Sequence, residues 1–122
     1  MPEFDLSATV LGCADPAGLA SFYRDLLGWE IQQKEPDWVT LRPSHGGAGL
    51  SFQTEEGHVP PTWPPASGDQ QMQLHLDIRV NDLDSAVSYA QSLGASLAQY
   101  QPQQDVRVLL DPAGHPFCLF QN

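Results

Sequence analysis

Residues 8–31, ATVLGCADPAGLASFYRDLLGWEI, and residues 74–97, LHLDIRVNDLDSAVSYAQSLGASL, follow one pattern and carry most of the information about the architecture. Each stretch begins with a short run typical of a β-strand and continues with apolar residues at the spacing of one helical face. Asp15 and Asp82 precede the helical parts, where an aspartate carboxylate is expected to cap the helix N-terminus. A Leu-Gly pair ends each helical part, as is common at helix C-termini. The chain therefore contains an internal duplication.

Three further strands are predicted after each helix. The expected strands are Trp29–Gln33, Trp38–Arg42 and Gly49–Gln53 in the first half, and Ser96–Tyr100, Val106–Leu110 and Phe117–Gln121 in the second. Turn-forming residues separate them, and the DPAG sequence at Asp111–Gly114 is a type I turn signature. Each half therefore has the order β-α-β-β-β, which predicts an α+β protein made of two βαβββ modules.

The two halves span about residues 4–56 and 70–121, and a proline-rich linker, 57–69, joins them in a single domain of 122 residues. The wider segment 54–73 carries four of the eleven prolines and has no periodicity, so a linker or an ordered surface loop is expected there. Trp63 lies among these prolines. It is expected to cover a gap in the core, to line the mouth of a pocket or to pack on a partner subunit.

The balance of charge limits the partners of the protein. Fifteen acidic residues oppose five basic ones, and the net charge of −10 argues against nucleic acids and anionic membranes, which would both be repelled. The charge permits cationic or neutral ligands. The sequence has no apolar run of membrane-spanning length and no signal-peptide pattern, so we expect a cytoplasmic protein. In that compartment Cys13 and Cys118 are expected to be free thiols in small, buried positions.

Three segments resemble the vicinal oxygen chelate superfamily: FYRDLLGWEI at 22–31, HLDIRVNDLDSAV at 75–87 and DPAGHPFCL at 111–119. Within it the chain is similar to glyoxalase-like and bleomycin-resistance-like proteins. The resemblance implies the glyoxalase/bleomycin resistance/dioxygenase fold, in which two modules form a cupped mixed sheet around the site, and it implies a homodimer. The superfamily includes glyoxalase I, extradiol dioxygenases and metal-free drug-sequestering proteins, so the fold leaves the reaction open.

The resemblance also implies four metal-ligand positions, one on the first and one on the last strand of each module. Histidine and glutamate suit a divalent ion there. In this chain the four positions are occupied by Ala8, Gln53, His75 and Cys118. Alanine cannot ligate a metal, glutamine is a weak neutral ligand, and His75 with Cys118 is an incomplete set. We therefore expect no metal cofactor, and the weak candidates for a divalent metal are His75, Gln53 and Cys118.

The polar residues of the second module's first strand share one face of the sheet. His75, Asp77 and Arg79 alternate with aliphatic residues, as expected for a strand with one face against a helix. His75 with Asp77 suits a general base with an orienting carboxylate, and the alternative is a hydrogen-bonded network without a catalytic role. His75 with Cys118 suits a nucleophile–base pair, and the alternative is that Cys118 is a small apolar filler.

The aromatic residues exceed what the core of so small a protein requires, so some are expected to line a pocket for a flat or hydrophobic ligand. The expected pocket residues are His75, Asp77, Arg79, Gln53, Cys118, Trp38 and Trp63. The incomplete ligand set favours metal-independent binding of a small organic molecule, which the acidic charge allows to be cationic or drug-like. The alternative is a lyase- or glyoxalase-type enzyme that uses His75 with a metal or with Cys118.

Overall fold

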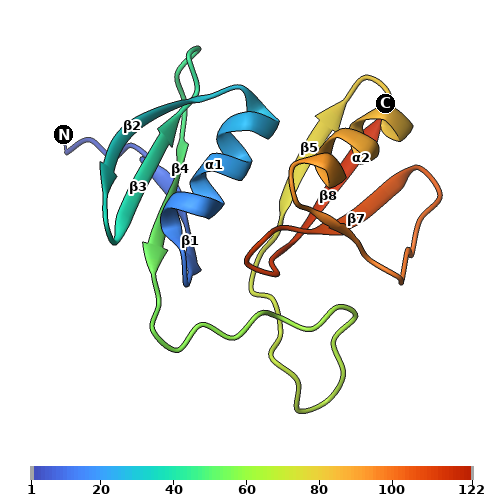
Figure 1. Cartoon of the computed structure of the whole chain (residues 1–122). Coiled ribbons are helices and arrows are strands. Elements are labelled where there is room, and N and C mark those ends of the chain that lie inside the picture. The colour runs from blue at the N-terminus through green and yellow to red at the C-terminus, as the bar shows by residue number, and fades with distance from the viewer. Residues whose placement is uncertain (1, 122) are drawn as a thin grey trace. The chain divides into compact units, whose positions relative to one another are not determined.

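The computed structural model describes residues 2–121, and its elements follow the predicted order (Figure 1). The first module contains β1 (Ala8–Cys13), α1 (Pro16–Leu27), β2 (Glu30–Glu35), β3 (Trp38–Arg42) and β4 (Gly49–Thr54). The second contains β5 (Leu76–Val80), α2 (Leu83–Ser92), β6 (Ser96–Leu97), β7 (Val106–Leu110) and β8 (Pro116–Gln121). The chain divides into two compact units between His58 and Val59, which confirms two βαβββ modules in an α+β fold.

In the first module, α1 covers one face of a four-stranded mixed sheet (Figure 1). The strand order is β1-β4-β3-β2, with β1 parallel to β4 and the other pairs antiparallel. Tyr23 of α1 stacks on Phe52 of β4, with ring centroids 5.8 Å apart, and both side chains are fully buried. Val39 and Leu41 of β3 are buried beside them. The apolar stripe of the helix thus packs on the aliphatic face of the sheet, as its periodicity predicts.

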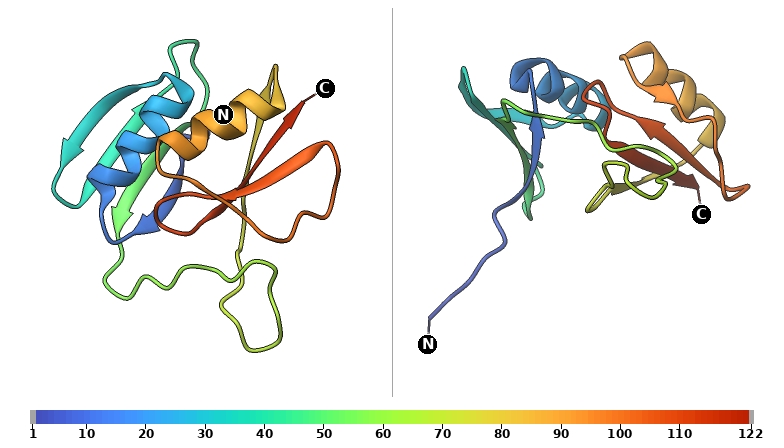
Figure 2. Two further views of the ribbon diagram at one scale, coloured as in Figure 1. Left: turned by 45° about the vertical axis from the view of Figure 1, so that its right-hand side comes forward. Right: turned by 90° about the horizontal axis from the view of Figure 1, so that it is seen from below.

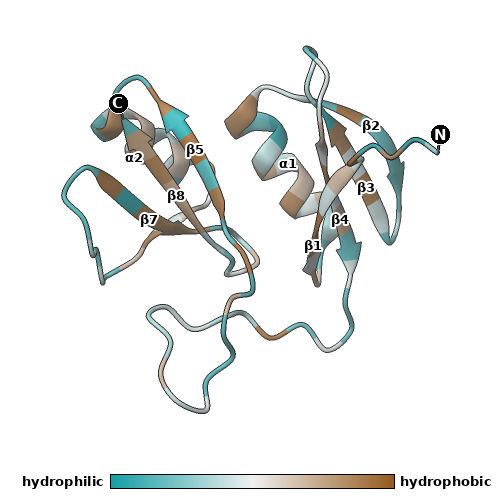
Figure 3. Cartoon of the chain, turned by 180° about the vertical axis from the view of Figure 1, so that it is seen from behind, coloured by the Kyte–Doolittle hydropathy of each residue, from teal (hydrophilic) through white to brown (hydrophobic). Residues whose placement is uncertain are grey.

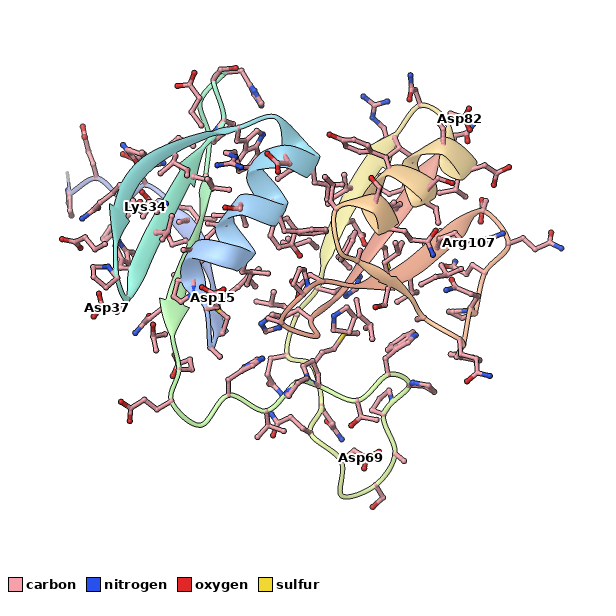
Figure 4. The ribbon with its side chains drawn as sticks, in the orientation of Figure 1. Asp15, Lys34, Asp37, Asp69, Asp82 and Arg107 are labelled. Carbon is pink, nitrogen blue, oxygen red and sulfur yellow. The ribbon has the colours of Figure 1, made fainter. Side chains whose placement is uncertain are left out.

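The ends of α1 have the predicted caps. The Asp15 carboxylate accepts a hydrogen bond from the Gly18 N–H at 3.1 Å, and Pro16 is the first helical residue. Gly28 follows the helix in the left-handed region (φ +73°), and its N–H donates to the Arg24 carbonyl at 2.8 Å. Figure 4 shows Asp15 at the start of α1 and Asp82 at the start of α2.

The second module repeats this architecture, with strand order β5-β8-β7-β6 and a parallel pair between β5 and β8. Phe117 and Leu119 of β8 are buried on the face that α2 covers. β6 is shorter than the predicted strand Ser96–Tyr100. The Ala98 N–H still donates to the Val108 carbonyl at 3.0 Å, but beyond it a side chain pairs with β7 in place of the backbone. The Gln101 amide bonds to both the N–H and the carbonyl of Val108, at 2.8 and 2.9 Å.

The N-terminus of α2 corrects one prediction. Asp82 occupies the N-cap position, but its side chain makes no capping hydrogen bond. The Leu83 N–H donates instead to the Gln121 side-chain oxygen at 2.8 Å, so the last residue of β8 caps the helix. Gly94 follows α2 in the left-handed region (φ +118°), as predicted. With 12 and 10 residues, neither helix of the described chain is long and apolar enough to cross a membrane.

The segment between the modules has no helix or strand, and Figure 2 shows it as a long loop. The division of the chain after His58 places most of the predicted linker, 57–69, in the second unit. Trp63 belongs to that unit: its indole N–H donates to the Tyr100 carbonyl at 3.1 Å, and the two ring centroids lie 6.1 Å apart. The loop is therefore anchored to the second module by an aromatic contact.

Candidate functional site

The parallel pair of β5 and β8 brings the chemically versatile residues of the second module together. Its register places Asp77 beside Cys118 and Arg79 beside Phe120. Neighbouring residues of a strand point to opposite faces, so Cys118 and Phe120 lie on the face away from α2. Figure 3 shows the contrast between the strands, with teal hydrophilic bands on β5 and a mostly brown β8. The open face of this sheet is thus polar along one strand and apolar along the next.

Three potential ligands meet on this open face. His75, directly before β5, has its Nε2 atom 3.1 Å from Oδ1 of Asp77. One ligating atom each of His75, Asp77 and Cys118 lies within 4.8 Å of the other two. Within residues 2–121, this trio is the group of three or more His, Cys, Asp or Glu side chains close enough to hold a metal ion. The structure therefore brings His75 and Cys118 together and adds Asp77, which the ligand positions taken from the resemblance do not include.

The environment of Cys118 suppresses its reactivity. Burial raises the pKa of the thiol, and the negative charge of Asp77 and a hydrogen bond with that carboxylate raise the pKa further. The thiol is therefore protonated at neutral pH. Because the thiolate is the nucleophilic form of cysteine, this environment does not favour a nucleophile–base pair with His75.

A hollow of about 260 Å³ opens beside the trio, within the second module. Its lining consists of Asp77, Gln103, Asp105, Val106, Cys118, Phe120 and Gln121. Two of these residues are acidic, two are apolar, two are amides, one is a thiol and none is basic. Asp77 and Cys118 are among the predicted pocket residues. Gln103 and Asp105 come from the loop before β7, and nothing in the sequence indicates that this loop borders the site.

His75 belongs to the trio beside the hollow, and the other four predicted pocket residues do not line it. Trp38 of β3 is the direct neighbour of Gln53 of β4, and both lie on the face of the first sheet away from α1. Arg79 lies on the open face of the second sheet, and Trp63 packs on Tyr100; neither lines the hollow.

The four metal positions implied by the resemblance do not form a suitable ligand set. Ala8 offers no donor atom, and the neutral amide of Gln53 belongs to the first module, as Ala8 does. The trio offers an imidazole nitrogen, a carboxylate oxygen and a thiol sulfur within one module. Compared with a set of histidines and glutamates, the trio adds a sulfur donor, which favours thiophilic ions such as zinc.

The first module has a second hollow, of about 450 Å³, which Trp29 and Arg42 help to line. Its one basic group is already engaged. The Arg42 guanidinium donates to the carbonyl and the hydroxyl of Ser7, both at 3.1 Å, and to the Gln32 side chain at 3.0 Å. Arg42 therefore fixes the segment before β1 to the sheet, and the other charged residue in the lining of this hollow is Glu30.

Comparisons with known proteins agree with this architecture. Residues 8–120 match the sequence model of a glyoxalase-like domain, and no curated protein matches the chain. One similar solved structure is a glyoxalase/bleomycin resistance protein/dioxygenase family enzyme from Burkholderia phytofirmans, with 21% identity, a TM-score of 0.73, and coverage of 97% of this chain and 98% of that one.

Two further structures carry more specific names. A bleomycin-binding protein from Streptomyces verticillus, complexed with copper(II)-bleomycin, has 21% identity and a TM-score of 0.60 over 100% of this chain and 99% of that one. A lactoylglutathione lyase from Agrobacterium tumefaciens has 18% identity and a TM-score of 0.60 over 100% and 96%. At these identities the likeness shows the fold alone, whereas the sequence model spans nearly the whole chain. The protein therefore belongs to the glyoxalase-like domain family.

Proposed function

We propose that the second module binds a small organic cation with an apolar or aromatic body, and that this binding requires no metal. The observation that carries the proposal is the lining of its hollow, which combines the carboxylates of Asp77 and Asp105 with the ring of Phe120 and contains no basic side chain. Carboxylates attract a cationic group, and an aromatic ring binds both the cation and an apolar body.

The volume of the hollow and the net charge of the protein support the same kind of ligand. A hollow of about 260 Å³ lies just below the usual range for pockets that bury drug-sized molecules, so it suits a small molecule or one end of a larger one. The net charge of −10 raises the local concentration of cations around the protein. The bleomycin-binding neighbour shows that this fold can hold an organic molecule, although at 21% identity it says nothing of the ligand here.

The test uses chelator-treated protein and three aromatic probes of one shape: a quaternary ammonium compound, its neutral isostere and a carboxylate analogue. We expect saturable binding of the cation by calorimetry, with a matching rise in Tm. We expect much weaker binding of the neutral probe and none of the anion. Equal binding of the cation and the neutral isostere contradicts the proposal, because the two carboxylates would then have no role.

A charge-neutralising variant tests where the cationic probe binds. Asp105→Asn removes one pocket charge and should weaken binding of the cationic probe about three- to fivefold, the size expected for one solvent-accessible ion pair. Asp37→Asn is the matched control, since it changes the net charge equally and lies in an exposed turn of the first module. If both variants weaken binding alike, the probe responds to the overall charge and not to the pocket.

The short contact between His75 and Asp77 favours one second candidate, a lyase- or glyoxalase-type enzyme. With its Oδ1 atom 3.1 Å from Nε2, the carboxylate orients the ring, which leaves Nδ1 to act as a general base. The test is turnover of the hemithioacetal of glutathione and a 2-oxoaldehyde. Turnover that His75→Ala abolishes supports this candidate, and no turnover by the intact protein rejects the glyoxalase-type reaction.

A further inference from the structure

The three donors of the trio come from adjacent positions of one sheet. Asp77 and Cys118 are direct partners in the parallel pair of β5 and β8, and His75 precedes Asp77 by two residues on the same face. Their ligating atoms are within 4.8 Å of one another, and the His75–Asp77 contact is already 3.1 Å. Donors bound to one tetrahedral zinc ion lie about 3.3 to 3.8 Å apart, so a movement of about 1 Å completes the geometry.

The side chains have room for that movement. The side chains of His75 and Asp77 are 38% and 62% exposed, and Cys118 is partly exposed at the edge of the hollow. Rotations of exposed side chains need no rearrangement of the core. The fixed part of the site is therefore the backbone register of two strands, and the adjustable part is at the surface.

The trio also contains a carboxylate and a thiol that a cation can bind together. Asp77 and the Cys118 thiol are two acidic groups side by side, and no basic residue is among those that line the hollow next to them. A dication that takes the place of the thiol proton binds both the carboxylate and the thiolate. Nitrogen, oxygen and sulfur donors together suit zinc and other thiophilic ions better than magnesium or manganese, which prefer oxygen.

We propose that His75, Asp77 and Cys118 form a three-ligand site for a thiophilic divalent cation of the zinc type, contained in the second module alone. It shares His75 and Cys118 with the positions implied by the family resemblance, but its third ligand is Asp77 of the same module, and neither Ala8 nor Gln53 of the first module takes part. Three protein ligands leave a fourth position of a tetrahedral ion open to water or to a small molecule. The inference goes beyond the proposed binding of an organic cation and does not depend on it.

The test is a titration of the chelator-stripped, reduced protein with Co²⁺, a spectroscopic substitute for Zn²⁺. We expect one equivalent to bind, with an intense near-ultraviolet sulfur-to-cobalt charge-transfer band and visible bands typical of tetrahedral cobalt. One equivalent of Zn²⁺ should displace the cobalt and bleach both sets of bands, whereas excess Mg²⁺ should not. Cobalt binding without the charge-transfer band overturns the proposal, as does the absence of binding at micromolar concentrations.

Variants assign the ligands. Cys118→Ser should abolish the charge-transfer band and weaken Co²⁺ binding about tenfold or more. Cys13→Ser is the matched control: Cys13 is the other cysteine, it is fully buried in the first module, and serine keeps a donor for the Gln53 carbonyl that the thiol contacts. Loss of the band in Cys13→Ser but not in Cys118→Ser overturns the assignment.

His75→Ala provides a second variant, because this exposed residue can be truncated without disturbing the core. It should keep a charge-transfer band from Cys118 but weaken Co²⁺ binding about tenfold. Unchanged affinity removes His75 from the site and contradicts the three-ligand proposal. The metal titration contains no organic probe, and the organic-cation test contains chelator. If one of the two tests fails, the result of the other can therefore still be interpreted.

Discussion

Cys118 and Asp77 show how one residue sets the chemistry of its neighbour. The two lie side by side on parallel strands, and the carboxylate disfavours ionisation of the thiol, which burial already disfavours. Without a metal, the thiol is therefore a weak nucleophile. The same pair becomes a strong ligand pair once a dication replaces the thiol proton, because metal binding selects the thiolate.

This relation predicts the effect of one substitution on thiol reactivity. In chelator, Asp77→Asn should speed alkylation of Cys118 by iodoacetamide near neutral pH, because removing the carboxylate lowers the pKa of the thiol toward its ordinary value. The acceleration should be modest, since burial is the larger cause of the raised pKa and persists in the variant. The measurement is made in the Cys13→Ser background, and equal rates in both proteins would contradict the assigned role of Asp77.

The two helices show that equivalent positions in a duplication need not work alike. Asp15 caps α1 through its side chain, whereas Asp82 precedes α2 without such a bond and Gln121 supplies the acceptor. The sequence pattern is the same in both cases. The difference comes from β8, whose end lies within reach of the first turn of α2.

A pair of alanine substitutions tests this difference in capping. Asp15→Ala should lower the free energy of unfolding by about 1 kcal/mol, because it leaves a helix N–H without its acceptor. Asp82→Ala should lower the free energy of unfolding clearly less, because it removes only a charge near the helix dipole. Urea denaturation followed by circular dichroism measures both. Equal losses would mean that Asp82 caps α2 in solution.

At the scale of the whole molecule, the charge of −10 acts on every cation that approaches. Raising the ionic strength from about 0.01 to 0.15 M shortens the screening length from about 30 to 8 Å. The Kd of a cationic probe for the pocket should therefore rise severalfold over this range. The Kd of its neutral isostere should stay nearly constant, and calorimetry at several salt concentrations measures both. If the Kd of the cationic probe did not change with the salt concentration, the probe would bind without long-range electrostatic attraction.

Most of the architecture can be predicted from the sequence, because both halves carry the same pattern of strands and helix. Helical periodicity, Asp15 and the Leu-Gly pairs predict both helices, and two strands, β3 and β7, have the predicted bounds. The shortened β6 was not predictable from propensity, since the Gln101 side chain competes for the backbone of Val108. Such competition depends on tertiary proximity, which a local pattern does not contain.

The candidate site was predicted only in part, for a related reason. Alternation along one strand places His75 and Asp77 on the same face, and in the structure Nε2 of His75 lies 3.1 Å from Oδ1 of Asp77. Cys118 joins them because β5 and β8 pair in parallel, and that register follows from the fold rather than from spacing. Asp105 reaches the hollow from an irregular loop, whose path no periodicity describes.

The pairing of β5 with β8 joins the first and last strands of the second module. An ion held by residues of both strands therefore acts as a reversible crosslink that closes the module on itself. The unfolded chain does not hold these residues together, so the ion binds the closed module more tightly and stabilises it by an amount that rises with the ion concentration. Saturation at about a hundred times the Kd would add about 2.7 kcal/mol and slow amide hydrogen exchange most strongly in these two strands.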